Sequence, residues 1–475
     1  MDTLALEHHL TSPQGSGHLP ADAFSATAGG GACCDEITIS LALDGSRVSD
    51  AGFQARGCPS ASAAASAAVT LVRDVPILDA AKIGAKHIAD ELGGLSPGKL
   101  HAAELAADAL ARALGAAARQ AAALAQTDPP TTLVAMSGGV DSAVAALLSA
   151  RRGPTIATTL ELWRDPENDG ERSCCSSSAV SQARALAHDM GLAHFTIDLR
   201  DEFRAGVVEP FIAGYASGET PNPCVGCNGH VRLDAMIDLA HRLGAAHLAT
   251  GHYARVAEQD HPDGPLLHTA ADSAKDQTYM LAALEPDSLA RMAFPLGELQ
   301  KPQVRELARA AGLPVAAKAD SQDLCFLAGT DRARFLARHG GVHDTEGTIV
   351  DRRGRVLGRH RGQHLFTVGQ RRGIRVATGE PQYVLAKDAA SNQVVVGPRA
   401  ALARRRIRLR DLALRRDAAR VSAVKLRYRS RRVPARLDGD VVELSEPVHG
   451  VAPGQLACLL DGELVVGWGT ITRGH

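Results

Sequence analysis

Long apolar segments and a secretion signal are both missing from this 475-residue chain. No uncharged apolar run reaches the roughly 18 residues that a membrane-spanning helix needs. The longest neutral stretch, Gly57 to Val72, is built mainly from Ala and Ser and is only weakly hydrophobic. The first twenty residues carry acids and histidines and lack the basic start and apolar core of a signal peptide. We therefore expect a cytoplasmic protein that makes no contact with a membrane.

Lysine is also scarce, with 8 residues against 44 arginines, which we attribute mainly to a coding-composition bias. The net charge of −1 hides a strong segregation. Residues 351–475 hold 25 Lys and Arg against 11 Asp and Glu, whereas residues 1–350 hold 27 against 42. Such asymmetry predicts contact with a polyanion, often a nucleic acid, with a solvated basic surface as the alternative.

The composition is that of an ordinary globular protein, with 45% hydrophobic and 22% charged residues and a mean hydropathy of −0.07. This excludes a wholly disordered or fibrous chain. The length is too great for one hydrophobic core, so we expect two to four domains. Nine cysteines in a reducing compartment indicate metal or redox chemistry rather than a disulfide framework.

The first part of the chain predicts a small α+β domain over residues 31–125, behind a flexible leader at 1–30 that shows no periodicity. Residues 36–43 alternate in the manner of a strand, Asp44-Gly45 supplies a turn, and a second strand follows over 48–55. Helices are expected over 60–71 and 100–124. The string QTDPP at 126–130 breaks the pattern and is typical of a linker.

Strands and helices then alternate over residues 131–340, which predicts a parallel α/β sheet. The expected strands lie at 132–136, 155–160, 194–199 and 247–250. Beyond residue 340, short β-rich runs separated by Gly, Pro and Asp-Gly turns predict two small β-barrel-like domains, 341–402 and 403–475.

A glycine-rich loop, Ser137 to Ser142 (SGGVDS), lies between the first strand of this sheet and a helix. Glycines let a backbone turn tightly against a phosphate, and the amides at a helix N-terminus bind its oxygens. Asp141 would repel phosphate unless a cation intervened, so we expect it to help hold Mg²⁺. The lysine of a Walker loop is absent. The string resembles the PP-loop of ATP pyrophosphatases of the adenine nucleotide alpha hydrolase-like class, which adenylate a carbonyl oxygen.

Two further strings carry cysteines. TPNPCVGCN presents Cys224 and Cys227 from a loop that Pro221 and Pro223 keep out of helical conformation, and SQDLCF presents Cys325. A lone C-x-x-C would be a weak signal. Together with ATGHYAR, KDQTY, FPLGELQKPQVRELA, TVGQRRG, LRYR and APGQ, in this order, these strings resemble the bacterial tRNA-specific 2-thiouridylases from about residue 131 onward.

This resemblance implies ATP-dependent 2-thiolation of the wobble uridine of the tRNAs for Lys, Glu and Gln. It implies a sulfur donor such as a cysteine desulfurase or a sulfur-relay protein. The residue matching Cys227 is the nucleophile, and the one matching Cys325 carries a persulfide. The implied ATP contacts are Ala135, Met136, Ser137, Gly138, Gly139, Val140, Asp141, Ser142, Leu162 and Gly251; the implied tRNA contacts are Asn222, Pro223, Cys224, His252, Lys275, Asp276, Gln277, Arg427, Tyr428 and Gln455.

Cys224 marks a subtype, because some members of that family have Asp at this position. Cys224, Cys227 and Cys325 would together supply three thiolates for a [4Fe–4S] cluster with one open iron. In the alternative, the thiols are metal-free: Cys227 attacks the sulfane sulfur on Cys325, and sulfide and a disulfide form. We interpret the adjacent pair Cys174-Cys175 as structural, and Cys458 receives no role.

The N-terminal strings CCDE and RGCPS place cysteines at strand ends, where a helix N-terminus lowers the pKa of a thiol and soft metals bind. They resemble the U-type (NifU/IscU-like) iron–sulfur scaffolds over about residues 15 to 120. Cys33, Asp35, Cys58 and His101 match that family's site, but Ala102 stands where it has a third cysteine. Three interpretations stay open: a cluster completed by Asp35 or Cys34, a zinc site, or a degenerate docking module.

Arginine clusters at 371–372, 404–410, 415–416 and 425–432 indicate phosphate contacts in the last third of the chain, where Tyr428 would stack on a base or a sugar. Two other functions compete with tRNA 2-thiolation. One is a different PP-loop sulfurtransferase or amidotransferase acting on tRNA or a small molecule, against which LRYR and APGQ speak. The other is a non-catalytic iron–sulfur carrier that binds RNA, against which the intact SGGVDS loop speaks.

Overall fold

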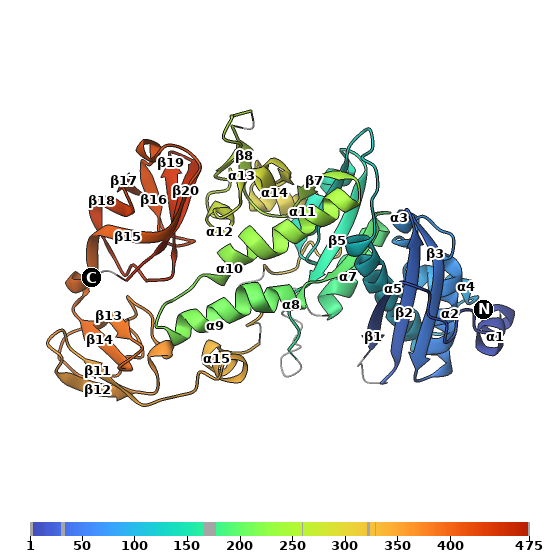
Figure 1. The fold of residues 1–475 in the computed structure, drawn as a ribbon, viewed down its shortest axis with the longest axis horizontal. Coiled ribbons are helices and arrows are strands. Elements are labelled where there is room, and N and C mark those ends of the chain that lie inside the picture. Colours follow the sequence, from blue (N-terminus) through green and yellow to red (C-terminus); the bar gives the residue numbers. More distant parts are fainter. Residues whose placement is uncertain are drawn as a thin grey trace.

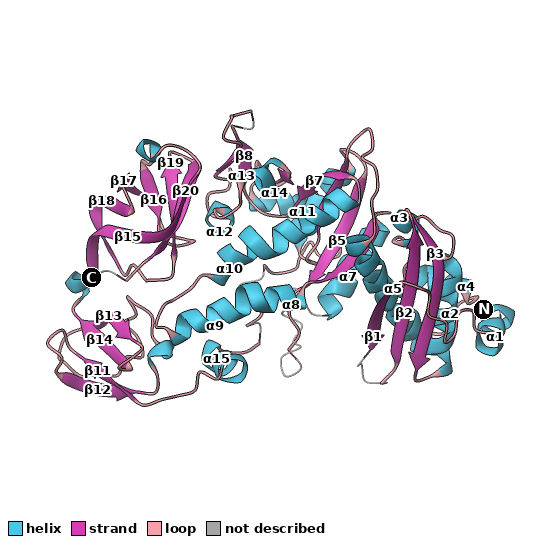
Figure 2. Ribbon diagram, viewed as in Figure 1, coloured by secondary structure: helices cyan, strands magenta, loops and turns pink. Residues whose placement is uncertain are grey.

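The computed structural model describes residues 3–29, 34–165, 177–258, 260–320, 324–327 and 329–473. Four units follow one another along the chain: an N-terminal α+β domain, a parallel α/β domain, a small four-stranded sheet and a C-terminal barrel (Figure 1). The N-terminal domain and the two β domains lie at opposite ends of the molecule, with the α/β domain between them (Figures 1 and 2). Within the described ranges, no helix combines the length and apolarity needed to cross a bilayer.

The N-terminal domain is a three-stranded antiparallel sheet in the order β1-β2-β3, with helices α2 and α5 packed on it. Alternate residues of β2, such as Ile37, Ile39 and Leu41, are fully buried, as period-2 patterning requires. The expected strands and helices are present. The elements are α1 (Thr3–Thr11), β1 (Phe24–Gly29), β2 (Glu36–Asp44), β3 (Arg47–Arg56), α2 (Pro59–Val72), α3 (Ile77–Ala80), α4 (Ala85–Glu91), η1 (Pro97–Lys99) and α5 (Leu100–Gln120).

The prediction of a flexible leader over residues 1–30 is wrong for the described residues 3–29. Helix α1 packs on α2, where His9 Nδ1 and Ser66 Oγ lie 2.9 Å apart. Strand β1 pairs along its whole length with β2. Its sequence, FSATAG, is rich in small and polar residues, so its strand character comes from cross-strand partners such as the hydroxyl pair Thr27–Thr38 and not from apolar alternation.

The α/β domain contains the predicted parallel sheet, in the order β10-β7-β4-β5-β6, with every neighbouring pair parallel. Because these strands are parallel, their carboxyl ends lie at the same edge of the sheet. The strands are β4 (Thr131–Ala135), β5 (Thr155–Glu161), β6 (Ala193–Asp198), β7 (Ala245–Ala249) and β10 (Met292–Ala293). The helical segments are α6 (Val140–Ala150), α7 (Ser177–Asp189), α8 (Arg200–Phe203), η2 (Arg204–Val208), α9 (Glu209–Ala216), α10 (Pro223–Gly226), η3 (Cys227–Arg232), α11 (Leu233–Arg242), α12 (Thr278–Leu281), α13 (Pro286–Ala290), α14 (Lys301–Ala310) and α15 (Arg332–Gly340).

The C-terminal residues form two β units, as predicted. The first is a four-stranded sheet in the order β12-β11-β14-β13, and the second is a ring of six strands closed by pairing of β15 with β20. A hairpin from the α/β domain, β8–β9, extends this ring at β20 and so ties the barrel to the α/β domain. The elements are β8 (Arg255–Ala257), β9 (Leu266–His268), β11 (Gly347–Val350), β12 (Val356–His360), η4 (Gln363–Leu365), β13 (Tyr383–Asp388), β14 (Gln393–Gly397), η5 (Arg399–Leu402), β15 (Ala403–Leu414), η6 (Ala418–Arg420), β16 (Ala423–Lys425), β17 (Val433–Asp438), β18 (Val441–His449), β19 (Leu456–Asp461) and β20 (Leu464–Ile471).

Helix α5 belongs to both the N-terminal and the α/β domain. One face packs on β1 and β2, and another packs on β6, the edge strand of the parallel sheet. Largely buried ion pairs cross this interface, from Arg112 to Glu161 (2.6 Å) and from Arg184 to Asp108 (2.7 Å). Residues 126–130 form an irregular connection, but these contacts fix the N-terminal domain in place against the α/β domain.

Gly115 marks the closest approach of α5 to β6, because a Cβ built there would lie 1.9 Å from the carbonyl oxygen of Thr196. Gly115→Ala should improve the intrinsic propensity of the helix and yet destabilise the protein, since the methyl group forces the two domains apart. We expect the thermal unfolding midpoint to fall by about 2–6 °C. Gly98→Ala, at a position with open space around it, is the matched control. An unchanged midpoint for Gly115→Ala would contradict the docking.

Candidate nucleotide and thiol site

The SGGVDS loop joins β4 to α6 in a conformation that needs its glycines. Gly138 has a φ of +68°, and a Cβ there would lie 2.9 Å from the carbonyl oxygen of Ala179. Ser142 Oγ accepts a hydrogen bond from the backbone N–H of Ser137 (3.1 Å) and donates to the carbonyl of Gly139 (3.1 Å). The loop is therefore closed on itself by its own hydroxyl, in front of the first amides of an eleven-residue helix. Such an arrangement is suited to bind phosphate oxygens.

The implied nucleotide contacts meet at one edge of the sheet. Ala135 ends β4, Leu162 follows β5 and Gly251 follows β7, and these three strands are neighbours. A Cβ on Gly251 would lie 2.7 Å from the backbone nitrogen of Ser142, so this glycine lets the loop after β7 touch the start of α6. The structure thus brings together residues from three separate stretches of sequence. Those stretches are Ala135, Met136, Ser137, Gly138, Gly139, Val140, Asp141 and Ser142; Leu162; and Gly251.

A network of lysines and aspartates beside the loop was not predicted. Lys301 Nζ, almost fully buried, lies 2.7 Å from both carboxylate oxygens of Asp141 and 2.8 Å from Asp320. Lys275 Nζ donates to Asp320 (2.7 Å), and Lys318 Nζ donates to the carbonyl of Gly138 (2.9 Å). Burial alone would raise the pKa of Asp320, but hydrogen bonds from Lys275 and Lys301 lower it to about 2. Three ammonium groups thus lie in or beside the network that borders the SGGVDS loop.

The scarcity of lysine in the sequence is a signal from which this network could have been predicted. The chain has 8 lysines, and Lys275, Lys301 and Lys318 all gather here. In a sequence biased towards arginine, a retained lysine indicates a position where the compact ammonium group fits and the larger, planar guanidinium does not. Lys301 fits this description, since its Nζ lies between two carboxylates.

The cysteine loop is positioned by its asparagine and prolines. Asn222 caps α10: its side-chain oxygen accepts a hydrogen bond from the backbone N–H of Cys224 (3.2 Å), and Pro223 occupies the first helical position. The chain stays helical through η3 into α11. Cys224 is half-buried and Cys227 is 7% exposed. Because residues three apart in a helix share a face, both thiols belong to one side of this segment.

Cys325 lies in the turn Leu324–Leu327, which packs on the helical layer that also supports the cysteine loop. The neighbouring Phe326 makes ring contacts with Phe203 of α8 (5.9 Å) and Phe211 of α9 (5.1 Å). The segment η2 between these helices contacts η3, in which Cys227 lies. The preceding residues 321–323, and also Cys174 and Cys175, lie outside the described residues.

Several residues expected at the tRNA have partners within the protein. Burial lowers the pKa of His252 to about 3, and its neutral ring lies 2.8 Å from Thr250 Oγ1 and 3.3 Å from Arg232. Asp276 is buried and pairs with Lys425 of the barrel (3.1 Å). Lys275 pairs with Asp320, as described, and the side-chain oxygen of Gln277 accepts the backbone N–H of Tyr253 (3.0 Å). Of these contacts, the Asp276–Lys425 pair joins the α/β domain to the barrel, and the others lie within the α/β domain.

The LRYR and APGQ residues lie on the barrel side of the same region. Arg427 is exposed and its guanidinium donates to the carbonyl of Gly450. Tyr428 is half-buried, and burial raises the pKa of its hydroxyl. Gln455 Nε2 donates to the carbonyl of Thr220 (2.6 Å), just before that loop. The barrel therefore contacts the segment that leads into the cysteine loop.

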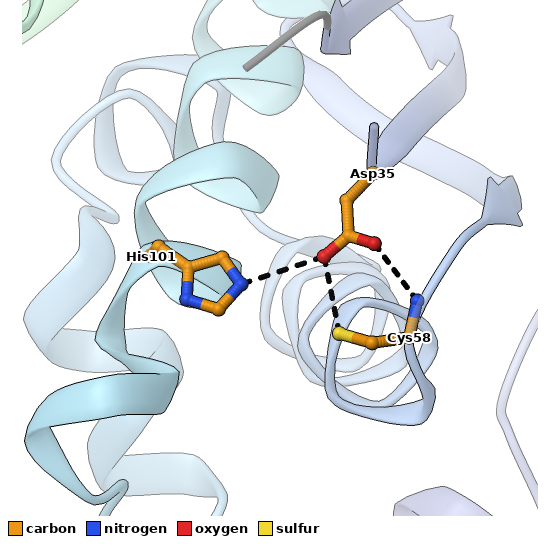
Figure 3. Close-up of side chains that lie close together, drawn as sticks. All are labelled: Asp35, Cys58 and His101. Atoms are coloured by element: carbon orange, nitrogen blue, oxygen red, sulfur yellow. Dashed lines mark hydrogen bonds and ion pairs between the residues drawn. The ribbon is translucent and has the colours of Figure 1, made fainter. Parts of the chain in front are cut away.

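A second site lies in the N-terminal domain, where Asp35, Cys58 and His101 converge (Figure 3). The ligand atoms of these three residues all lie within 4.8 Å of one another. Asp35, 2% exposed, accepts hydrogen bonds from the backbone N–H of Cys58 (2.8 Å) and from its thiol (3.1 Å), and lies 3.4 Å from His101 Nε2. A carboxylate, a thiol and an imidazole form a donor set for a transition metal.

The remaining scaffold positions differ from the expected set. Cys33 lies outside the described residues, and Cys34 is exposed with a φ of +55°. Ala102 is fully buried in α5 and offers no ligand atom. Gly57, with a φ of +122°, is required beside the site, since a Cβ there would lie 2.0 Å from Asp35 Oδ1.

Fold and site together define a composite protein, in which an α/β domain with a PP-loop and a C-x-x-C loop is joined to a scaffold-like α+β domain and two β domains. Four family models match the chain in this order: NifU-like N terminal domain (residues 3–123), tRNA methyl transferase HUP domain (130–329), tRNA methyl transferase PRC-barrel domain (333–398) and Aminomethyltransferase beta-barrel domain (406–471). These matches confirm the predicted fold classes.

Relatives identify the family. The chain is 44% identical to the bifunctional protein NifU/MnmA of Rubrobacter xylanophilus, over 98% of this chain and 97% of the relative. It is 43% identical to the tRNA-specific 2-thiouridylase MnmA of Solibacter usitatus and 42% identical to that of Zymomonas mobilis, over 71% and 73% of this chain and 98% and 95% of those relatives. The chain belongs to the family of bifunctional NifU/MnmA proteins, which confirms both resemblances stated above.

Proposed function

We propose that this protein is an ATP-dependent tRNA-uridine 2-sulfurtransferase that carries a fused scaffold-like metal module. The observation that carries the proposal is the PP-loop at the sheet edge together with a capped C-x-x-C loop that the barrel domain contacts. The substrate is the wobble uridine of the tRNAs for Lys, Glu and Gln, as implied by similarity to the 2-thiouridylases. Exposed arginines of the β domains, at 371–372 and at 404–408 on β15, neutralise tRNA phosphates.

In the first step, the C2 oxygen of uracil attacks the α-phosphorus of ATP, and pyrophosphate leaves. The loop amides and the ammonium groups of Lys275, Lys301 and Lys318 stabilise the charge on the phosphates. Asp141 and Asp320 offer hard oxygen ligands that suit Mg²⁺, which would offset phosphate charge. The product is an adenylated uridine in which the C2 oxygen has become part of a good leaving group.

In the second step, sulfur replaces AMP at C2. Cys325 receives a sulfane sulfur as a persulfide from a donor such as a cysteine desulfurase or sulfur-relay protein. The Cys227 thiolate attacks the Cys325 sulfur, so the two cysteines are oxidised to a disulfide and the terminal sulfur is released, reduced, as hydrosulfide. Hydrosulfide adds to C2 and AMP departs with the original oxygen. A thiol reductant then regenerates both cysteines.

A second candidate mechanism is favoured by Cys224, which lies one helical turn before Cys227. Cys224, Cys227 and Cys325 would then hold a [4Fe–4S] cluster, which supplies an open iron for sulfide when bound. Thiolates are the donors that such a cluster takes, and of these three cysteines Cys227 is buried while Cys224 and Cys325 are partly buried.

For the N-terminal module, we propose a single zinc-type ion bound by Asp35, Cys58 and His101, because the described donors include one thiolate and Ala102 removes a second. Elemental analysis of the purified chain should find about one zinc bound at this site. Cys58→Ser and His101→Ala should each release it, while His8→Ala, at an exposed histidine, should not. Iron and acid-labile sulfide that disappear with Cys58→Ser would show a cluster instead.

The function is tested with unmodified tRNA transcripts, ATP, Mg²⁺ and a persulfide donor under anaerobic conditions. Mass spectrometry of the digested tRNA should show 2-thiouridine at the wobble position, together with one AMP released for each sulfur incorporated. Formation of 2-thiouridine should require ATP. Absence of 2-thiouridine, or a methylated product in the presence of a methyl donor, would overturn the proposal.

A further inference from the structure

The five residues that lead into the cysteine loop, Gly218 to Asn222, are held by groups from both β domains. Arg410 of β15 binds Glu219 through two parallel hydrogen bonds, Nη1 to Oε1 (2.7 Å) and Nη2 to Oε2 (2.9 Å). The Glu219 side chain is only 17% exposed. The hydrogen bonds from Arg410 lower the pKa of Glu219, so the carboxylate stays charged. A bidentate pair of this kind fixes orientation as well as distance.

The turn of the barrel at residues 453–456 forms hydrogen bonds with the next residue of the segment, Thr220. The backbone N–H of Thr220 donates to the carbonyl of Pro453 (2.8 Å), and Gln455 Nε2 donates to the carbonyl of Thr220 (2.6 Å). Gly454, with a φ of +86°, leaves room for this contact, because a Cβ there would lie 3.0 Å from the Glu219 Cβ. Both polar backbone groups of Thr220 are thus used by the barrel.

The four-stranded sheet holds the same segment from another side. Lys387 Nζ donates to the carbonyls of Phe366 (3.0 Å) and Glu219 (3.3 Å). Gln363 Nε2 donates to the carbonyl of Tyr215, at the end of α9 (3.0 Å). Three domains therefore meet at a segment that has no regular secondary structure of its own.

The sequence between this anchor and the thiols is stiff. Pro221 and Pro223 have fixed φ angles, and the Asn222 side chain caps the helix that begins at Pro223. Only three residues separate Thr220 from Cys224. A displacement of Glu219 and Thr220 is consequently passed on to Cys224 and Cys227 and is not absorbed by a flexible linker.

We propose that Arg410 and Glu219 form a positioning pair through which the tRNA-binding barrel sets the reactive geometry of the Cys224–Cys227 loop. The inference rests on the proposed function, since it assigns the pair a role in thiolation. Neither residue touches the reacting atoms; Arg410 acts through Glu219, and Glu219 acts through the backbone of the loop. The sulfur chemistry is thereby coupled to correct seating of the barrel.

A double-mutant cycle with the full-length protein tests the pair. Arg410→Ala and Glu219→Gln should each lower kcat for thiolation about tenfold, with KM for tRNA changed by less than about twofold, because a misplaced nucleophile affects chemistry more than binding. The double variant should also lose about tenfold rather than about a hundredfold. Arg436→Ala, which removes an arginine–glutamate pair elsewhere on the barrel, should retain the wild-type kcat. Additive losses, or a loss confined to KM for tRNA, would overturn the proposal and make Arg410 a phosphate contact.

A second readout does not depend on turnover. The rate at which iodoacetamide alkylates Cys227, followed by peptide mass spectrometry without tRNA, should rise at least about threefold in Arg410→Ala and Glu219→Gln but not in Arg436→Ala. Thermal unfolding midpoints close to wild type would exclude global unfolding as the cause. Unchanged alkylation would overturn the inference. If alkylation rises while the wild-type protein shows no thiolation, the positioning pair stands and the proposed function fails.

Discussion

Thiolation by the Cys227→Ser and Cys325→Ser variants should be lost, with a decrease of at least about a thousandfold, while ATP binding is retained. Serine is nearly isosteric with cysteine, but its hydroxyl is not ionised at neutral pH and cannot carry sulfane sulfur. Neither cysteine belongs to the nucleotide edge of the sheet formed after β4, β5 and β7. The two variants should therefore still bind ATP and form the adenylated uridine.

The measurement is a single-turnover assay that follows pyrophosphate release, which reports adenylation, and 2-thiouridine formation separately. Cys458→Ala is the matched control, because this thiol of β19 is buried in the apolar cluster that joins the barrel to the α/β domain and has no role in the proposed chemistry. Full thiolation activity of Cys227→Ser or of Cys325→Ser would remove the assignment of sulfur transfer to these two residues.

Cys224→Ser separates the two sulfur mechanisms. In the persulfide mechanism, this variant keeps substantial activity, and anaerobically purified protein shows no iron that depends on Cys224. In the cluster mechanism, the wild-type chain contains iron and acid-labile sulfide that Cys224→Ser loses. Metal analysis of these two proteins decides which mechanism operates. The Cys58→Ser variant is analysed as well, so that metal bound at the N-terminal site is counted separately.

Local sequence was sufficient for the parts of the protein whose structure is set by neighbouring residues. The SGGVDS loop lies between a strand and a helix as predicted, because its glycines and the hydroxyl of Ser142 determine the turn. The cap at Asn222 and the C-x-x-C spacing are local features too. Strand β1 was missed for the opposite reason: its small polar residues become a strand only because β2 supplies partners.

Contacts between distant residues could not be predicted in this way. Lys301 and Asp141 are separated by 160 residues, and Arg410 and Glu219 by 191. A salt bridge leaves no periodic pattern in a sequence, and both partners are ordinary surface residue types. The docking of α5 against β6 was missed because a helix with two buried faces resembles any Ala-rich helix.

The Lys301→Met variant should lose ATP-dependent adenylation by about a hundredfold, while its thiols remain reactive. Lys301 Nζ lies between Asp141 and Asp320, with the backbone N–H of the same residue donating to Asp272 (2.9 Å). Without the ammonium group, two carboxylates are left close together beside a loop that has to receive a polyphosphate. A hundredfold loss corresponds to about 2.7 kcal/mol of transition-state stabilisation, the lower end of what removal of one such donor typically costs.

Asp320 would keep Lys275 and Arg305 as partners in this variant, and Asp141 would keep the hydroxyl of Tyr253 (2.9 Å), so the local fold should survive. Lys301→Arg should not restore activity, because the planar guanidinium is larger than the ammonium group and the position is 8% exposed. Lys82→Met, which removes an exposed lysine of the N-terminal domain, is the control.

The readout is the rate of pyrophosphate release in the presence of tRNA. Calorimetry measures the affinity for ATP, and the rate of Cys227 alkylation checks that the cysteine loop is intact. Wild-type rates of pyrophosphate release from Lys301→Met would show that the lysine network is structural. A loss shared by Lys301→Met and Lys301→Arg, with alkylation unchanged, would place Lys301 at the phosphates. The few lysines of this arginine-rich chain would then mark its nucleotide site.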